Sequence, residues 1–161
     1  MPNWCSNNVT FTGTEANLNN FQRLLDKTIK VQESHGNGEM LIRLEGVLDG
    51  YMFWIQTTDT GVISFESRWN PIPQDIVRIA QLFDLDFEYE YEESGCDLYG
   101  KYTYENGMLT CQCLDEDEAN SCKTYNKDDD IHDVDYDKLW DLVEEADCES
   151  VELHSSLIQV E

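Results

Sequence analysis

The chain has 161 residues, the length of one ordinary domain, and 40% of them are hydrophobic, which suffices for a core and excludes full disorder. With 34 acidic and 10 basic residues, its formal net charge at pH 7 is −24. This charge excludes direct binding to nucleic acid phosphates or to anionic membrane surfaces, because both depend on Lys and Arg. The partners we expect are basic proteins or cations.

The negative charge is concentrated in the second half of the chain. Residues 1–83 contain 9 acidic and 6 basic side chains, whereas residues 84–161 contain 25 acidic and 4 basic ones. Repulsion at this density opposes a compact fold, so the asymmetry calls for a reason. The plain reason is solubility, with the acidic segments simply solvated; the alternative is a binding surface.

No targeting or membrane-spanning segment is apparent in the sequence. Residues 1–8 lack the basic start and the apolar run of a signal peptide, and no apolar run approaches the roughly 18 residues of a membrane span. We therefore expect a protein of the host cell cytoplasm. There the cysteines stay reduced, at positions 5, 96, 111, 113, 122 and 148.

The first part of the chain alternates between strand and helix patterns. Strands are indicated by β-branched and aromatic runs, and helices by apolar residues at helical spacing. In chain order we expect a strand at 9–12, a helix at 14–29, strands at 51–57 and 62–69, a helix at 73–83 and a strand at 86–92. This βαββαβ order predicts an α+β, ferredoxin-like fold with an antiparallel sheet and both helices on one face.

An extension follows this core. Runs at 97–104 and 108–114 flank Asn106 and Gly107, a pair typical of a hairpin turn. Residues 115–134 contain few large apolar side chains and are expected to form an acidic loop. We then expect a helix at 135–146 and a strand at 151–160. The chain is thus predicted to be one domain of 1–161, with a core at 1–92, an added hairpin at 93–114 and an acidic extension at 115–161.

Three segments carry a resemblance to a known family. They are the opening residues 1–7, the segment Glu66-Ser67-Arg68-Trp69-Asn70-Pro71, and residues 89–95 together with Gly100. The chain resembles the YubB-type ferredoxin-like family of bacterial plasmids and phages over roughly residues 1–113. The resemblance implies a ferredoxin-like fold and an origin on a mobile element. It implies no established activity, no functional residue and no iron–sulfur cluster.

The acidic half contains regular rows of carboxylates. In residues 86–92 the aromatic side chains should face the core and the carboxylates the other face, spaced by roughly 6.7 Å. On the predicted last helix, Asp137, Asp141 and Glu145 recur roughly every 6 Å. Phosphates of one DNA strand recur every ~3.4 Å of axis, so such rows could imitate DNA. Acidic side chains on an exposed sheet face also simply prevent aggregation.

The candidate partner-binding residues belong to these rows and to the acidic runs between them. They are Glu88, Glu90, Glu92, Asp115, Glu116, Asp117, Glu118, Asp128, Asp129, Asp130, Asp133, Asp135, Asp137, Asp141, Glu144 and Glu145.

Metal sites and catalysis have weaker support. Cys111, Cys113, Cys122 and His132 could bind zinc, but their spacing fits poorly. The acidic residues at 133, 135, 137, 141 and 144 match a calcium loop except that Lys138 stands where glycine is required. No motif of a hydrolase or a phosphate-binding loop appears. We expect no catalytic residue, no cofactor and no bound metal.

These observations favour a non-enzymatic function. We expect a phage or plasmid protein that binds and inhibits a basic host protein, namely a DNA-binding defence factor, through charge complementarity. One alternative is an acidic accessory protein that docks through aromatic side chains near Trp4 or Trp69, although core packing is the plainer expectation for both tryptophans. A metal-binding or hydrolytic enzyme is the third.

Overall fold

A computed structural model of the chain describes residues 3–35, 51–128 and 131–153. The elements up to Glu105 are β1 (Trp4–Thr12), α1 (Glu15–His35), β2 (Phe53–Asp59), β3 (Val62–Arg68), α2 (Pro73–Phe83), β4 (Asp86–Glu93) and β5 (Leu98–Glu105). They are followed by β6 (Met108–Cys113), α3 (Glu116–Ser121), β7 (Lys123–Asn126), β8 (Ile131–Val134), α4 (Tyr136–Glu145) and β9 (Glu149–Glu152).

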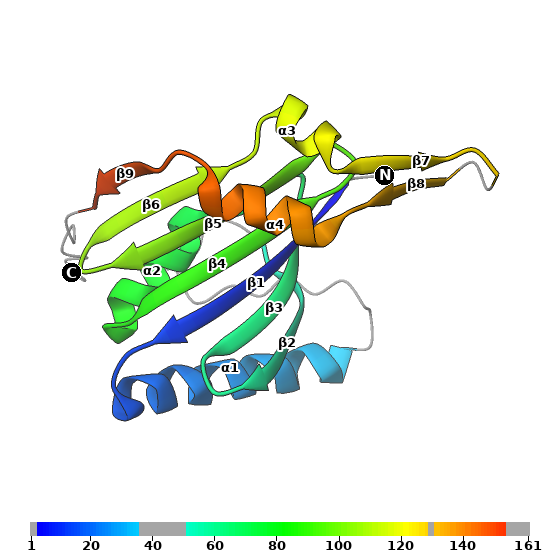
Figure 1. The fold of residues 1–161 in the computed structure, drawn as a ribbon. Helices are drawn as coiled ribbons and strands as arrows, with labels where there is room; N and C mark the ends of the chain where they lie inside the picture. The colour runs from blue at the N-terminus through cyan, green and yellow to red at the C-terminus, as the bar shows by residue number, and fades with distance from the viewer. Residues whose placement is uncertain (1–2, 36–50, 129–130, 154–161) are drawn as a thin grey trace.

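The main sheet has seven strands in the order β2-β3-β1-β4-β5-β6-β9, and every neighbouring pair is antiparallel (Figure 1). The α+β class with an antiparallel sheet is therefore confirmed. Strands β7 and β8 form a separate two-stranded sheet. Among the described residues, none of the helices has the length and apolarity that a bilayer span requires.

Local sequence explains the best-defined elements. In β4, Phe87, Tyr89 and Tyr91 are buried while Glu88 and Glu90 are exposed, as strict alternation along a strand requires. Helix α2 begins at a proline, whose fixed φ suits the first helical turn. It ends where Asp84 adopts a left-handed conformation with φ 53° and Leu85 N–H donates to Ala80 O at 2.8 Å.

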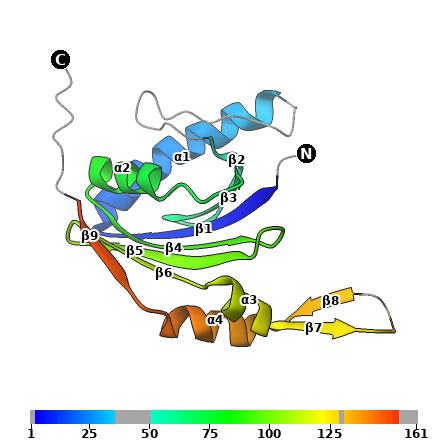
Figure 2. The same ribbon diagram turned by 90° about the horizontal axis from the view of Figure 1, so that it is seen from above.

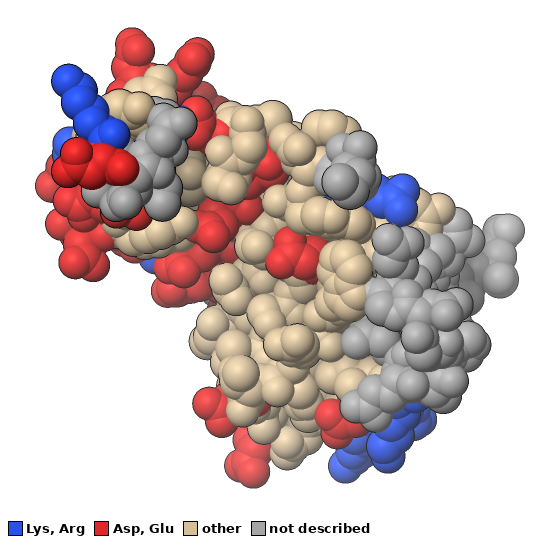
Figure 3. Space-filling view, turned by 90° about the vertical axis from the view of Figure 1, so that its right-hand side faces the viewer, with Lys and Arg blue, Asp and Glu red and all other residues tan. Residues whose placement is uncertain are grey.

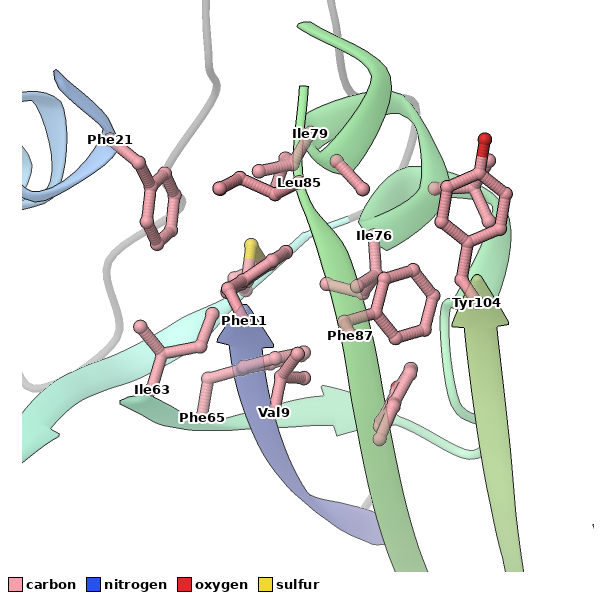
Figure 4. Close-up of a cluster of buried hydrophobic side chains, with 14 of the residues drawn as sticks. Val9, Phe11, Phe21, Ile63, Phe65, Ile76, Ile79, Leu85, Phe87 and Tyr104 are labelled. Carbon is pink, nitrogen blue, oxygen red and sulfur yellow. The ribbon is translucent and has the colours of Figure 1, made fainter. Parts of the chain in front are cut away.

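The main core lies between one face of the sheet and helices α1 and α2, which sit side by side on that face (Figure 2). Aromatic rings connect the two layers: Phe11 lies 4.7 Å from Phe21 and 6.0 Å from Phe87 between ring centroids, and Phe21 lies 5.5 Å from Phe83. Figure 4 shows Phe11, Phe21 and Phe87 converging with aliphatic residues of β3 and α2. Burial of this cluster fixes both helices on the sheet.

A second, smaller core lies on the opposite face. There α4 crosses β5 and β6, with α3 beside it (Figures 1 and 2). Leu139 and Val143 of α4 are fully buried and pack with Tyr99 of β5, with Leu114 directly after β6 and with Cys122. Gln112 reinforces the docking by donating to the carbonyls of Glu144 and Ala146 at 3.0 and 3.3 Å. The acidic helix is thus attached by an apolar contact.

The expectation of an acidic loop at 115–134 is wrong, because this segment contains α3, β7 and β8. Helix α3 is stabilised by a capping box in which Asp115 accepts from Glu118 N–H and Glu118 accepts from Asp115 N–H. The segment has few apolar residues, but Ala119 and Cys122 are almost fully buried and attach α3 to the rest of the protein.

The last strand also differs from the expectation of 151–160. Strand β9 ends at Glu152, and residues 154–160 lie outside the described residues. Its four side chains are all exposed, so no alternation of apolar and polar residues marks it. The first strand starts at Trp4 rather than at residue 9. The sequence pattern did not indicate its first half, because the polar residue Asn7 occupies a buried position there.

A buried polar network explains this burial of Asn7. Its side-chain nitrogen donates to Cys5 O at 2.7 Å and to Ser67 Oγ at 2.9 Å, and its oxygen accepts from the Tyr89 hydroxyl at 2.5 Å. The same hydroxyl accepts from the backbone N–H of Ile72 at 3.0 Å. The network ties β1, β3, β4 and the start of α2 together and satisfies every one of these buried groups.

We expect the substitution Tyr89→Phe to lower the free energy of unfolding by about 1–3 kcal/mol, because it leaves the Asn7 side-chain oxygen and the Ile72 N–H with one partner fewer inside the protein. Urea unfolding followed by circular dichroism measures this change. The matched control is Tyr104→Phe, whose hydroxyl accepts one 3.3 Å bond from Gln81 at a part-buried position. An equal effect of the two substitutions would contradict the importance of the network.

Candidate functional site

Helix α4 presents a row of carboxylates to solvent. Since Leu139 and Val143 face the sheet, Asp137, Asp141 and Glu145 are exposed on the outer side. The three residues are spaced four apart, so they lie along one face of the helix. Glu144 is exposed as well, but its carboxylate is 2.8 Å from Lys101 Nζ.

A second row lies on β4. Glu88 and Glu90 are exposed, and Glu92 is half-buried, on the sheet face that carries α4. Lys101 of β5 links the β4 row to helix α4, because its Nζ is 3.7 Å from Glu88 and 2.8 Å from Glu144, which lies beside the α4 row. Hydrogen bonding to Glu144 raises the pKa of Lys101, so this cation stays charged. The structure therefore brings the β4 row and the α4 row to one face of the sheet.

The remaining candidate residues lie on α3, on the β7–β8 hairpin and on the connections between them. Glu116, Asp117, Asp128 and Asp133 are exposed. Three others act within the fold: Asp115 and Glu118 cap α3, and Asp135 caps α4 by accepting from Lys138 N–H at 3.1 Å. Asp129 and Asp130 lie outside the described residues.

Together, α3, β7, β8 and α4 form a surface that we call the acidic layer (residues 115–147). Figure 3 shows carboxylates gathered over the upper left part of the molecule, where basic side chains also project, while another group of Lys and Arg side chains lies at the lower right. The lysines of the second half contribute little free positive charge here. Lys123 binds Asp97 at 2.6 Å, Lys138 Nζ donates to Ser121 O at 2.7 Å, and Lys101 is engaged as described, while Lys127 is exposed.

The structure separates the cysteines that a zinc site would need. Cys111 and Cys113 alternate with Gln112 along β6, on the side of α1 and α2, whereas Cys122 is buried with Leu139 under α4. The described residues contain no group of three or more side chains suited to hold a metal ion. Burial raises the pKa of Cys5 to about 12 and, with the charge of Cys113, that of Cys111 to about 11, so both are weak nucleophiles.

The calcium-loop pattern is divided between two elements. Asp133 lies in β8, Asp135 caps α4, and the later acidic positions lie along α4 itself. A helix cannot fold around an ion as a binding loop does. The alternative of a helix at these positions is therefore the correct one.

Comparison with known proteins identifies the fold family. Residues 50–135, just over half of the chain, match the model of the ferredoxin-like domain in Api92-like protein. The chain belongs to this family. No curated protein and no solved structure matches the chain. The matched range of this Api92-like domain runs from the residues before β2 to the start of α4, so it includes α3 and the β7–β8 hairpin.

This member of the Api92-like family also has a group of residues that sequence reasoning missed, and Ser6 of this group precedes the matched range. On the sheet face that carries α4, in the part that α4 does not cover, Ser6, Trp54, Gln56, Glu66 and Glu92 line a cavity of about 450 Å³, which we call the carboxylate groove. Glu66 and Glu92 come from strands on either side of β1. Only the strand register brings them together, and no local motif contains that information.

The tryptophans divide between two environments. Trp4 and Trp54 are half-buried, with ring centroids 4.9 Å apart, and each contacts Phe53. Trp69 is 48% exposed and has a positive φ of 67°. The expectation of core packing is therefore wrong for Trp69, which lies in the connection between β3 and α2.

Glu92 should make stability depend on pH. Burial and the charge of Glu66 raise the pKa of Glu92 above its ordinary 4.5. The folded state thus holds this proton more tightly than the unfolded state, and stability falls as pH rises through the raised pKa. We expect Glu92→Gln to increase the free energy of unfolding at pH 7 and to have little effect at pH 4, measured by urea unfolding.

The control for this prediction is Glu90→Gln, which neutralises the exposed neighbour on the same face of β4. We expect it to change stability by less than about 0.5 kcal/mol at pH 7. A loss of stability in Glu92→Gln at pH 7 would show that ionised Glu92 is favourable in the fold.

Proposed function

We propose that this protein is a non-enzymatic product of a phage or plasmid that binds and inhibits a basic, DNA-binding host protein. The observation that carries the proposal is the acidic layer, whose carboxylates are exposed while three of the four lysines of residues 84–161 bond to groups within the protein. A surface of this kind attracts a basic partner and repels nucleic acid.

The geometry of the rows supports imitation of DNA. Side chains two residues apart on β4 recur at roughly 6.7 Å, and those four apart on α4 at roughly 6 Å. Both repeats are about twice the ~3.4 Å spacing of phosphates on one DNA strand. Because both rows are held on regular elements, and Lys101 links Glu88 of β4 to Glu144 of α4, their spacing is fixed before binding. A partner built to hold DNA would meet a similar pattern of charge.

The rigid attachment of α4 also favours this function over mere solubility. Solvated acidic segments need no ordered structure, yet α4 is held by a buried apolar cluster and by the two hydrogen bonds of Gln112. Preorganised charges lose less entropy when a partner binds.

The test neutralises the outer face of α4 with Asp137→Asn, Asp141→Asn and Glu145→Gln together. Glu144 is left intact because it binds Lys101. Proteins captured from bacterial lysate on the immobilised chain are identified and their association rates are measured at several salt concentrations. We expect the triple variant to associate several-fold more slowly at low salt and to show a weaker salt dependence, and duplex DNA to compete with the intact protein.

The matched control neutralises Glu15, Asp26 and Asp59, three exposed acidic residues of α1 and β2 outside the acidic layer. It removes the same charge and should leave association nearly unchanged. If the triple variant binds as fast as the intact protein and DNA does not compete, imitation of DNA is refuted.

The exposed Trp69 supports a second candidate, an acidic accessory protein that docks through aromatic side chains. A tryptophan that is 48% exposed beside Arg68 is a typical centre of a protein interface. A complex formed in this way would be nearly insensitive to salt, and Trp69→Ala would weaken it while the triple variant would not. The same binding measurements therefore decide between the two candidates.

A further inference from the structure

The carboxylate groove contains two acidic side chains that face one another across β1. Ser6 is paired in register with Glu66 of β3 on one side and with Glu92 of β4 on the other. Directly opposed residues of antiparallel strands point to the same face, so both carboxylates flank Ser6. Each is half-buried, and burial together with the charge of Glu66 raises the pKa of Glu92. The two groups thus repel one another at the floor of a concave site.

One of these carboxylates is incompletely satisfied. Glu66 Oε1 accepts a 2.9 Å hydrogen bond from the Ser6 hydroxyl, but its Oε2 is buried and has no hydrogen-bond partner. No ion pair within the described residues reaches Glu66 or Glu92. A buried, uncompensated carboxylate oxygen costs free energy that a bound cation would recover.

An aromatic wall completes the groove. Strands β2 and β3 shift register between Phe53 and Gln56, and within this irregularity Trp54 adopts a φ of 49°. Trp54 lines the groove together with Gln56. A positive φ in a bulky residue is uncommon and is retained where the surroundings hold it.

The protein itself shows that this aromatic cluster accepts a guanidinium. Arg68 lies on the same strand as Glu66, yet its guanidinium carbon sits 5.0 Å from the Phe53 ring centroid and 5.9 Å from that of Trp4. It is stacked on these rings and makes no ion pair with Glu66. Trp54, the third member of the cluster, is left at the wall of the groove.

We propose that the carboxylate groove binds an arginine side chain supplied by a basic protein partner, with the guanidinium between Glu66 and Glu92 and its plane against Trp54. This rests on the proposed function for the source of the arginine, although the site itself is a property of this chain alone. Arginine is favoured over lysine because its planar fork suits carboxylates and stacks on indole rings. A cavity of about 450 Å³ is of the size that accommodates small ligands.

The experiment titrates the isolated full-length protein with Nα-acetyl-argininamide at low salt and pH 7 and follows the tryptophan indole N–H signals by NMR. We expect saturable shifts of the Trp54 signal, with a dissociation constant of the order of 1 mM. Nα-acetyl-lysinamide should bind at least threefold more weakly. Glu66→Gln and Glu92→Gln should each weaken the arginine probe at least fivefold.

Glu105→Gln is the matched control. It removes one exposed carboxylate at the end of β5, far along the sheet from Glu92, which pairs with Tyr99 near the start of β5. It should leave the affinity for the probe unchanged. The absence of saturable shifts overturns the proposal, and so does equal binding by Glu66→Gln or by the lysine probe. Because no partner is needed, this result is separate from the partner test. The groove can bind the arginine probe while the partner test refutes imitation of DNA. Equally, the partner test can support imitation of DNA while the probe does not bind.

Discussion

Burial of apolar side chains on both faces of one strand is the constraint on which the rest of the structure depends. Tyr104 of β5 packs into the main core beside Phe87, while Tyr99 of the same strand packs under α4. A strand that alternates normally buries one face only, so β5 marks where the open ferredoxin-like sheet becomes a three-layer structure. Without Tyr99, Leu114 and the apolar stripe of α4, the acidic layer would have nothing to hold it to the sheet.

This arrangement also explains how the fold tolerates its charge. Repulsion among surface carboxylates opposes compactness, and it is offset here by local uses of the same groups. Asp115, Glu118 and Asp135 cap helices, Glu93 accepts the N–H groups of Gly95 and Cys96, and Glu144 binds Lys101. Acidic residues in the first turn of a helix are further favoured by its dipole. Among the outward-facing acids of α4 and β4, Asp141, Glu145 and Glu90 serve none of these purposes, which makes them the natural candidates for binding.

The sequence was informative where a pattern is local. The alternation in β4, the proline that begins α2 and the Asn106-Gly107 turn each specify backbone geometry within a few residues, and these elements lie within two residues of their expected bounds. Helix α3 and the β7–β8 hairpin were missed because short elements with few apolar residues give no periodic signal. The carboxylate groove was missed for another reason: Glu66 and Glu92 are 26 positions apart, and only their common pairing with Ser6 unites them.

The acidic layer and the carboxylate groove act over different distances. A field from many exposed carboxylates extends for about a Debye length, roughly 8–10 Å at physiological salt, and governs how fast a basic partner arrives. It discriminates poorly between basic surfaces, because it responds to total charge. A concave site with two carboxylates and an indole wall acts only in contact, and it rewards a planar cation placed at one position. The carboxylate groove would therefore provide the specificity that the acidic layer alone lacks, and the two together would select one DNA-binding protein among many.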